Sequence, residues 1–437
     1  SKVTKDIVKK VGSWDLLSSD SISTIPVQDG PPDETPANET PATPHPTIET
    51  SEPTGTASIP SQATGSSGIK FSVGSSTEAF GDGDTVYFPS NTDLTHLNMG
   101  VVGDLGNGKT QLVQSLARQI TRNPENNRGI SPKILILDYK RDYCDPDKPA
   151  FALKTKAKIV KPRNIPLNMF DTKGDDNPRA WLDRSRFFID LLKKIFNVSA
   201  PVQSNHVKEA VKNSFGENGD RIPTIYDVFS EYKQLVDNRV DSAYSIMDDI
   251  VDNEFFEPDQ SRVQSFDEFF DGVVIIDLNA LGQDDKSKNM LVAIFLNFYY
   301  EYMARLKKTE FIGTDPQLRS IDSYLIVDEA DNIMKYEFPV LMKLLLEGRE
   351  FGVGVILSSQ YLSHFKTRNV NYMEPLLTWF VHRVPNVTSA QLGMMGLPEV
   401  SRSVLDKIAS LKKHECFCKT LGHDGEFIRG IPFFELD

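Results

Sequence analysis

The sequence VVGDLGNGKT, residues 101–110, decides how the rest of this chain is interpreted. It matches the phosphate-binding loop (P-loop) pattern G-x-x-x-x-G-K-[ST]. The mostly apolar run 96–102 precedes it and can form a buried strand, and residues 110–120 follow it. In that second segment the apolar side chains share one face of a helix: Leu112, Val113, Leu116 and Ile120. A glycine-rich turn that matched by chance would lack these flanks, so the segment predicts a nucleoside triphosphate site.

The loop offers a triphosphate two kinds of contact. Its glycines let backbone N–H groups approach phosphate oxygens closely, and the N-terminus of the following helix adds the positive end of its dipole. We expect Lys109 to reach the β- and γ-phosphates and the Thr110 hydroxyl to ligate Mg²⁺. The residues predicted to bind the nucleotide here are Gly103, Asp104, Leu105, Gly106, Asn107, Gly108, Lys109, Thr110 and Gln111.

The composition argues against several classes of protein. With 437 residues and a net charge of −13, the chain is not a globally basic nucleic-acid binder, although a ring can enclose a basic channel within an acidic exterior. Three unevenly spaced cysteines favour a reducing compartment over a disulfide framework. No apolar run approaches bilayer length and no signal peptide is evident, so we expect a cytoplasmic protein without membrane contact. The opening residues, from Ser1, are typical of mid-protein sequence, and we expect an excerpt or a processed chain.

Changes in composition divide the chain into four parts. Residues 1–68 are rich in Pro, Thr, Ser and Glu and predict a disordered linker. Residues 69–170 hold the P-loop and form the first part of the predicted core. Residues 171–265 carry apolar side chains at helical spacing and predict a helical insertion, whose apolar stripe we interpret as packing rather than a partner site. Residues 266–437 complete the core.

Strands alternating with helices predict an α/β fold with a mainly parallel central sheet and right-handed crossovers. A long helix is expected over 287–306, and another helix that runs through Leu346. The runs at 69–74 and 85–88 are expected to be strands that lead into the strand before the P-loop. The remaining expected strands are 133–138, 159–160, 273–278, 324–329, 353–360, 379–384, 416–420 and 427–433.

The run YLIVDE, residues 324–329, is a Walker B pattern, in which mainly hydrophobic residues precede two acids. Hydrolysis needs one carboxylate near Mg²⁺ and a second that orients and deprotonates the attacking water. We assign Asp328 to the metal and Glu329 to the water. Many strands end in acids, so the run alone is weak evidence, but the P-loop upstream makes the assignment strong.

Four further polar residues are candidates, and each has an ordinary structural alternative. Gln360 ends a strand, where it could contact the γ-phosphate or the attacking water, or could simply close the strand. Arg349 and Arg383 could stabilise the transferring phosphoryl group, Arg349 from a neighbouring subunit, or could pair with surface carboxylates. Asp138 could point toward the phosphates or the Mg²⁺ shell, or could cap a turn or form a salt bridge.

The residues His414, Cys416, Cys418 and His423 raise the question of a zinc site. Their C-x-C spacing alternates as in a strand, and residues 422–425 have the composition of a hairpin turn. Structural zinc sites favour C-x₂₋₄-C spacing, so a strand and hairpin is the preferred interpretation.

The ordered series of motifs resembles the HerA/FtsK-type motor ATPases. The segments that carry the resemblance are LTHLNMGVVGDLGNGKTQ, LILDYKRDY, IPLNMFD, VVIIDLNAL, LIVDEAD, EGREFGVGVILSSQ and FVHRVPN. It covers the chain from about residue 69 onward, apart from the helical insertion. Two positions depart from the family pattern: Asn107 stands where Ser or Thr often precedes the last loop glycine, and Asp331 stands where His often follows Asp-Glu-Ala.

The resemblance implies a RecA-like P-loop NTPase core that uses ATP and Mg²⁺. It also implies a ring, usually a hexamer, with ATP at the subunit interfaces and duplex DNA in the pore. In the family pattern Arg349 is the arginine that acts in trans, Asp138 the acid after the second strand, and Gln360 the sensor glutamine.

The first functional hypothesis is therefore an ATP-driven DNA translocase in bacterial defence against foreign DNA. The sequence shows no nuclease constellation, so cutting would require separate nuclease or adaptor subunits. A second hypothesis is a conjugation- or secretion-type coupling ATPase, which would need a membrane anchor. A third is a scaffold that binds ATP as a switch and moves nothing.

Overall fold

The computed structural model describes residues 68–78, 85–87, 97–122, 124–172, 177, 179–196, 200–216, 222–309, 319–397, 400–420 and 424–436. The predicted linker, residues 1–68, lies outside these residues except for its last position. Among the described helices, none is both long and apolar enough to cross a membrane.

An 11-stranded sheet forms the centre of the described chain, in the order β2-β1-β11-β10-β9-β3-β8-β7-β4-β6-β5. From β9 to β5 every neighbouring pair is parallel, as predicted, and the pairs from β2 to β9 are antiparallel. The strands are β1 (Ser72–Ser76), β2 (Thr85–Tyr87), β3 (Met99–Val102), β4 (Lys133–Asp138), β5 (Lys158–Val160), β6 (Val273–Asp277), β7 (Ser323–Val327), β8 (Val353–Ser359), β9 (Thr378–Val381), β10 (Glu415–Lys419) and β11 (Glu426–Gly430).

Strands β1 and β2 precede β3 in the sequence but do not lie beside it. They extend the antiparallel end of the sheet, where β1 pairs with β11, and the three strands β11, β10 and β9 separate β1 from β3. The pairing depends on the hairpin of β10 and β11, which comes more than three hundred residues later in the chain. The sequence therefore predicted these two strands correctly, but their nearness to β3 in the chain did not predict which strands they pair with.

Apolar side chains cover both faces of the sheet because its central strands are buried on both sides, as a parallel sheet requires. In β4, Leu135 and Leu137 pack into the cluster that contains α9 (Asp285–Arg305) and α11 (Pro339–Glu347). The alternate residues Ile134 and Ile136 pack with α2 (Lys109–Ile120) and α3 (Ala150–Thr155) on the other face. The remaining short helices of the core are α8 (Phe266–Phe269), α10 (Asp331–Met334), α12 (Ser389–Gly393) and α13 (Arg402–Ala409).

The helix expected to run through Leu346 is divided into α10 and α11. Pro339 is the first residue of α11. Proline has no N–H to donate to the preceding turn and disfavours a helical conformation in the residue before it, so one continuous helix cannot run through this position. The predicted helix at 287–306 is present as α9.

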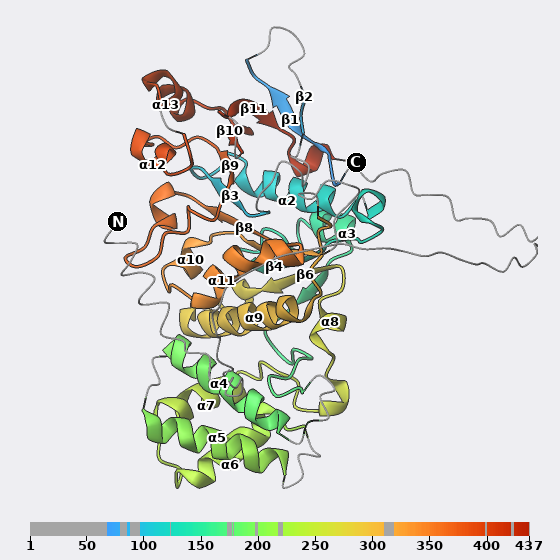
Figure 1. Cartoon of the computed structure of the whole chain (residues 1–437), viewed down its shortest axis with the longest axis vertical. Helices are drawn as coiled ribbons and strands as arrows, with labels where there is room; N and C mark the ends of the chain where they lie inside the picture. The colour runs from blue at the N-terminus through green and yellow to red at the C-terminus, as the bar shows by residue number, and fades with distance from the viewer. Residues whose placement is uncertain are drawn as a thin grey trace, which may run out of the picture. The chain divides into compact units, whose positions relative to one another are not determined.

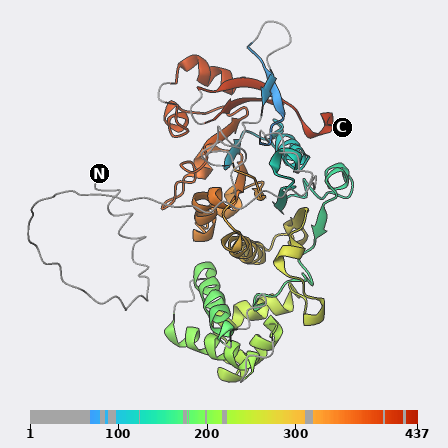
Figure 2. The ribbon, with the colours of Figure 1, turned by 45° about the vertical axis from the view of Figure 1, so that its right-hand side comes forward.

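The helices expected within residues 171–265 are present as a group that packs beside α9 (Figures 1 and 2). They are α4 (Ala180–Phe196), α5 (Pro201–Phe215), α6 (Ile225–Leu235) and α7 (Ser242–Asp252). The Phe187 ring stacks on Phe298 of α9, and Arg184 makes a two-point ion pair with Glu301 at 2.9 and 3.2 Å. The group therefore shares its apolar core with the sheet through α4.

Candidate nucleotide-binding site

The parallel strands bring most of the predicted site residues to one edge of the sheet. The P-loop follows β3, and β8 and β9 flank β3 in parallel register. Because parallel strands end at a common edge, Asp328 and Glu329 after β7, Gln360 after β8 and Arg383 after β9 lie near the loop. Residues far apart in the sequence thus meet around one short segment.

The loop has the backbone shape that an anion site requires. Gly108 has a φ of 99°, which side-chain-bearing residues rarely adopt, and a Cβ there would lie 2.5 Å from Nδ1 of His414. A Cβ at Gly103 would lie 2.5 Å from Cβ of His382. Helix α2 begins at Lys109, and no side chain caps its first turn. The backbone N–H groups of that turn are therefore available to phosphate oxygens.

Lys109 is buried and its ammonium group donates to the backbone oxygen of Asp104 at 3.2 Å. Burial lowers the pKa of Lys109, while the charges of Asp328 and Glu329 act in the opposite direction. An anionic phosphate in the loop would stabilise the charged form of this buried lysine further.

The residues predicted to hold the metal are in contact. The Thr110 hydroxyl donates to Oδ2 of Asp328 at 3.0 Å, and the Tyr143 hydroxyl donates to the same oxygen at 3.2 Å. A hydroxyl and a carboxylate side by side next to the phosphate loop are hard oxygen ligands of the kind that Mg²⁺ takes alongside nucleotide phosphates. The donor set fits the ion that the sequence predicted.

Glu329 occupies a strained position directly after Asp328. Its φ is 56°, a left-handed conformation that is uncommon for a residue with a side chain. Its carboxylate forms an ion pair with Lys140 and accepts a hydrogen bond from Nε2 of Gln360 at 3.4 Å. Gln360 therefore contacts the predicted base directly, and Lys140 is a site residue that the sequence reasoning missed. The motif LILDYKRDY contained it, but only the fold brings it to Glu329.

Asp138 caps the turn after β4. Its two oxygens accept hydrogen bonds from the backbone N–H groups of Lys140, Asp142 and Tyr143 at 2.9–3.2 Å, and from the Cys144 thiol at 3.4 Å. Burial raises the pKa of Asp138, and these hydrogen bonds oppose the shift. Of the two sequence alternatives, its contacts are those of the capping acid. Asp138 orients Tyr143, whose hydroxyl then reaches Asp328.

The two arginines lie in different places. Arg383 is beside the P-loop: its backbone oxygen accepts from the Asp104 N–H at 2.8 Å, and its guanidinium lies 4.0 Å from the Asp104 carboxylate. Arg349 lies in a 3₁₀ turn, Gly348–Phe351, just before β8. The loop is at the other end of this strand, about 20 Å away at roughly 3.3 Å per residue. Arg349 is thus too far to reach the P-loop of its own subunit.

His382 follows β9 and packs against Gly103 of the P-loop. Its Nδ1 is 3.0 Å from the backbone oxygen of Glu415, and burial, with the nearby Lys109 charge, lowers its pKa to about 3. It is therefore a neutral side chain at pH 7, and it packs where Gly103 leaves room. The sequence segment FVHRVPN included this histidine without indicating its role.

The cysteine segment forms β10, which pairs with β11 in the antiparallel manner expected of a hairpin. Cys416 is buried and Cys418 is partly buried. Over the part of the chain that the structure describes, no three His, Cys, Asp or Glu side chains are grouped so that they could hold a metal ion. His423 lies outside the described residues.

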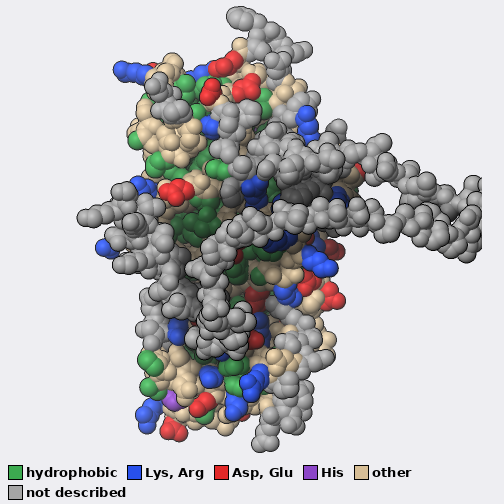
Figure 3. All heavy atoms as spheres, in the orientation of Figure 1, with side chains coloured by type: hydrophobic (Ala, Val, Ile, Leu, Met, Phe, Trp, Pro, Cys, Tyr) green, Lys and Arg blue, Asp and Glu red, His purple; other side chains and the backbone are tan. Residues whose placement is uncertain are grey.

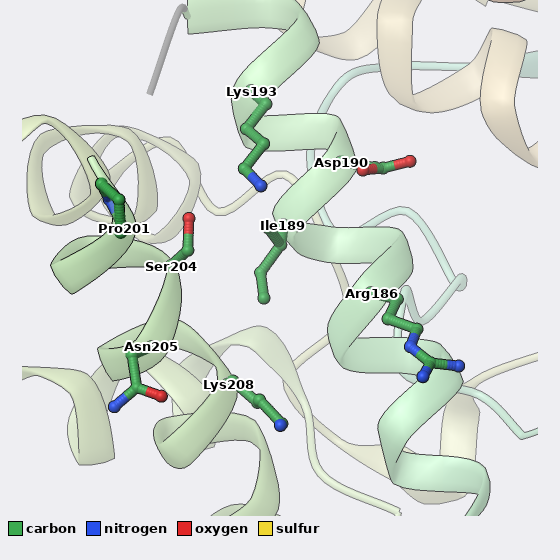
Figure 4. A pocket seen from close by; sticks show the side chains of 8 residues that line it. All are labelled: Arg186, Ile189, Asp190, Lys193, Pro201, Ser204, Asn205 and Lys208. Atoms are coloured by element: carbon green, nitrogen blue, oxygen red, sulfur yellow. The ribbon is translucent and has the colours of Figure 1, made fainter. Parts of the chain in front are cut away.

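An open hollow of about 470 Å³ lies between α4 and α5 (Figure 4). Arg186, Lys193 and Lys208 line it together with the acid Asp190. No P-loop residue lines this hollow, so it is separate from the nucleotide site. Basic and acidic side chains are interspersed over the helical group on the face seen in Figure 3.

No protein-family model and no curated protein matches the sequence. Solved structures do show a similar fold. VirB4 of Thermoanaerobacter pseudethanolicus has a TM-score of 0.59 at 13% identity, over 85% of this chain and 98% of that chain. The plasmid coupling protein TrwB, solved in complex with ADP and Mg²⁺, has a TM-score of 0.50 at 14% identity, over 78% of this chain and 86% of that chain. The chain has the RecA-like fold of these P-loop ATPases.

Proposed function

We propose that this protein hydrolyses ATP with Mg²⁺ and uses the energy to move duplex DNA, as HerA/FtsK-type motors do. One observation carries the proposal: the Thr110 hydroxyl lies 3.0 Å from Asp328, with Glu329 next in the chain. The P-loop and the Walker B acids, more than two hundred residues apart, therefore form one site. TrwB, whose fold is similar, holds ADP and Mg²⁺.

In the proposed reaction each residue has a distinct task. The P-loop N–H groups and Lys109 bind the phosphates, and Thr110 and Asp328 hold Mg²⁺, which neutralises charge on the phosphate oxygens. Glu329 orients the attacking water and accepts its proton at a carboxylate oxygen. Gln360, 3.4 Å from Glu329, is placed to hold the same water or the γ-phosphate. Arg383 lies beside Asp104 and is the nearer arginine for the phosphates of its own subunit.

A ring gives Arg349 a function that a single subunit cannot. It is distant from its own P-loop, so it contributes only if a neighbouring subunit presents it to the nucleotide. We therefore propose self-association into a ring, a hexamer by resemblance to the family, with ATP at each interface. Each P-loop is then half of a site that the neighbour completes.

The sequence Gly-Asn-Gly-Lys-Thr-Gln at 106–111, together with the helical insertion, resembles that of DptH, the HerA-like ATPase of phosphorothioation-dependent DNA restriction. We therefore propose a role as the motor subunit of a bacterial restriction or defence system. Separate nuclease or adaptor subunits would then cut the DNA.

A second candidate is a coupling ATPase of conjugation or secretion. The similarity of fold to VirB4 and to the plasmid coupling protein TrwB favours it. The two candidates share the ATP site and differ in partners. Co-purification of nuclease subunits supports the restriction role, whereas co-purification of membrane secretion components supports the coupling role.

The test is ATP turnover with and without duplex DNA, combined with particle size. A motor is expected to form larger particles with ATP and to hydrolyse faster when duplex DNA is added. A nucleotide-switched scaffold would bind ATP without any response to DNA, and that result would contradict the proposal.

A further inference from the structure

We propose that the exposed ring of Phe434, supported edge to face by His414, is the stacking surface for the base of the bound nucleotide, which is a purine. This aromatic pair, named here the base platform, lies beside the P-loop and the first turn of α2. The inference rests on the proposed function, since it assigns the base-contacting residues of the same nucleotide site.

The position follows from how a triphosphate enters a P-loop. Its β- and γ-phosphates lie at Lys109 and Thr110, so the α-phosphate and the attached nucleoside extend past the first turn of α2. The segment that contains Phe434 packs there, and the Phe434 N–H donates to Oε1 of Gln111 at 3.4 Å. Gln111 is thus a contact between the loop helix and the platform.

His414 touches the P-loop itself. Its backbone N–H donates to the oxygen of Asn107 at 3.0 Å, and its Nδ1 occupies the space where a Cβ of Gly108 would lie. The rings of His414 and Phe434 meet edge to face, with centroids 5.5 Å apart. His414 therefore contacts the phosphate-binding loop directly, and Phe434 contacts His414.

Phe434 is exposed although its segment is well anchored. Phe434 is 63% exposed, whereas the preceding Phe433 is 4% exposed. The Phe433 ring packs against the Phe151 ring, with the ring centroids 5.4 Å apart. Arg429 and Glu435 fix the segment with a two-point ion pair at 2.5 and 3.0 Å. Exposure alone would not indicate a ligand, since single exposed apolar residues are common. The position of this anchored ring beside the P-loop is what assigns it to the nucleotide.

The chemistry of the pair suits a nucleobase. Stacking on an aromatic ring is open to every base because each has a π-face, and purines offer the larger area. Burial, with the charges of Lys413 and Arg429, lowers the pKa of His414, so this ring is neutral at pH 7. The Phe434 ring has no donor or acceptor that could separate adenine from guanine, and Nδ1 of His414 faces Gly108 of the loop. The platform is expected to favour purine over pyrimidine triphosphates and to treat ATP and GTP alike.

The test compares two ligands on the full chain with Phe434→Ala, by calorimetry in Mg²⁺. ATP carries a base, and inorganic tripolyphosphate does not. The variant is expected to bind ATP roughly tenfold more weakly, because the base loses its aromatic stacking partner. Its affinity for tripolyphosphate is expected to stay unchanged, and Phe434→Trp is expected to retain ATP affinity.

Val240→Ala is the matched control, because Val240 is an exposed apolar residue between α6 and α7. It is expected to change neither affinity. Equal loss of both ligands by Phe434→Ala, or loss of neither, would overturn the platform. Smaller particles with unchanged ATP affinity would also overturn it, because Phe434 would then contact a second copy of the chain. If the unaltered protein bound neither ligand, the proposed function itself would fail.

Discussion

Lys140 offers a sharp test of how the catalytic carboxylate is positioned. It forms an ion pair with Glu329, the residue proposed to activate water, and the same carboxylate accepts a hydrogen bond from Gln360 at 3.4 Å. Because the φ of Glu329 is 56°, the side chain starts from a strained backbone and depends on these partners to stay aimed at the site. Replacing Lys140 with Met keeps the length of the side chain and removes its charge.

The magnitude follows from the exposure of the pair. The Lys140 side chain is 45% exposed, so the interaction belongs with partly exposed ion pairs, worth about 1 kcal/mol. If that energy keeps Glu329 in its productive orientation, the turnover number for ATP falls about fivefold in Lys140→Met.

Arg141→Met is the matched control for the Lys140 prediction. Arg141 is the next residue and is 40% exposed, but it pairs with Asp277 at 3.2 Å rather than with Glu329. The assay is steady-state ATP hydrolysis at saturating ATP and Mg²⁺. The reasoning is refuted if Lys140→Met turns over ATP at the normal rate, or if both variants slow turnover equally.

Three further predictions concern the metal, the ring and the fold. Asp328→Asn is expected to weaken Mg²⁺-dependent ATP binding at least tenfold while thermal unfolding is little changed, which binding titrations with and without Mg²⁺ can check. Arg349→Ala and Lys109→Ala subunits are expected to be inactive alone but partly active when mixed, because one interface type in a mixed ring is intact; mixtures with no activity would contradict action in trans. His382 has a pKa of about 3, below its ordinary value of 6.5, so the unfolded chain takes up a proton that the folded chain does not. The folded state is therefore fully stable with respect to this group above pH 6.5, and it loses about 2 kcal/mol of stability by pH 5. In His382→Asn the free energy of unfolding is expected to fall less steeply between pH 6.5 and pH 5, which denaturant titrations at several pH values can check.

The local parts of the site could be predicted because their signals are contiguous. The P-loop, the two Walker B acids and the apolar strands around them each depend on a few neighbouring residues. The alternation of Leu135 and Leu137 with Ile134 and Ile136 already required a strand buried on both faces, which the parallel sheet provides.

The remaining features depend on contacts that span the chain. Lys140 meets Glu329 across 189 positions, and His414 meets the P-loop across about three hundred. The sequence around Lys140 or His414 contains no pattern that predicts these contacts. Asp138 shows a different limit: a carboxylate after a strand can serve a ligand or a turn, and its hydrogen bonds from the N–H groups of Lys140, Asp142 and Tyr143 become visible only in the fold. The distance of Arg349 from its own P-loop likewise required the strand order.

The central claim is that Asp328 and Glu329 complete the P-loop as a DNA-responsive ATPase site. The most direct measurement compares ATP turnover of the unaltered chain and of Glu329→Gln, each with and without duplex DNA, alongside ATP affinity. We predict that duplex DNA accelerates the unaltered chain, and that Glu329→Gln binds ATP normally but turns it over at least about a hundredfold more slowly under both conditions. Turnover by Glu329→Gln at the normal rate would contradict the account.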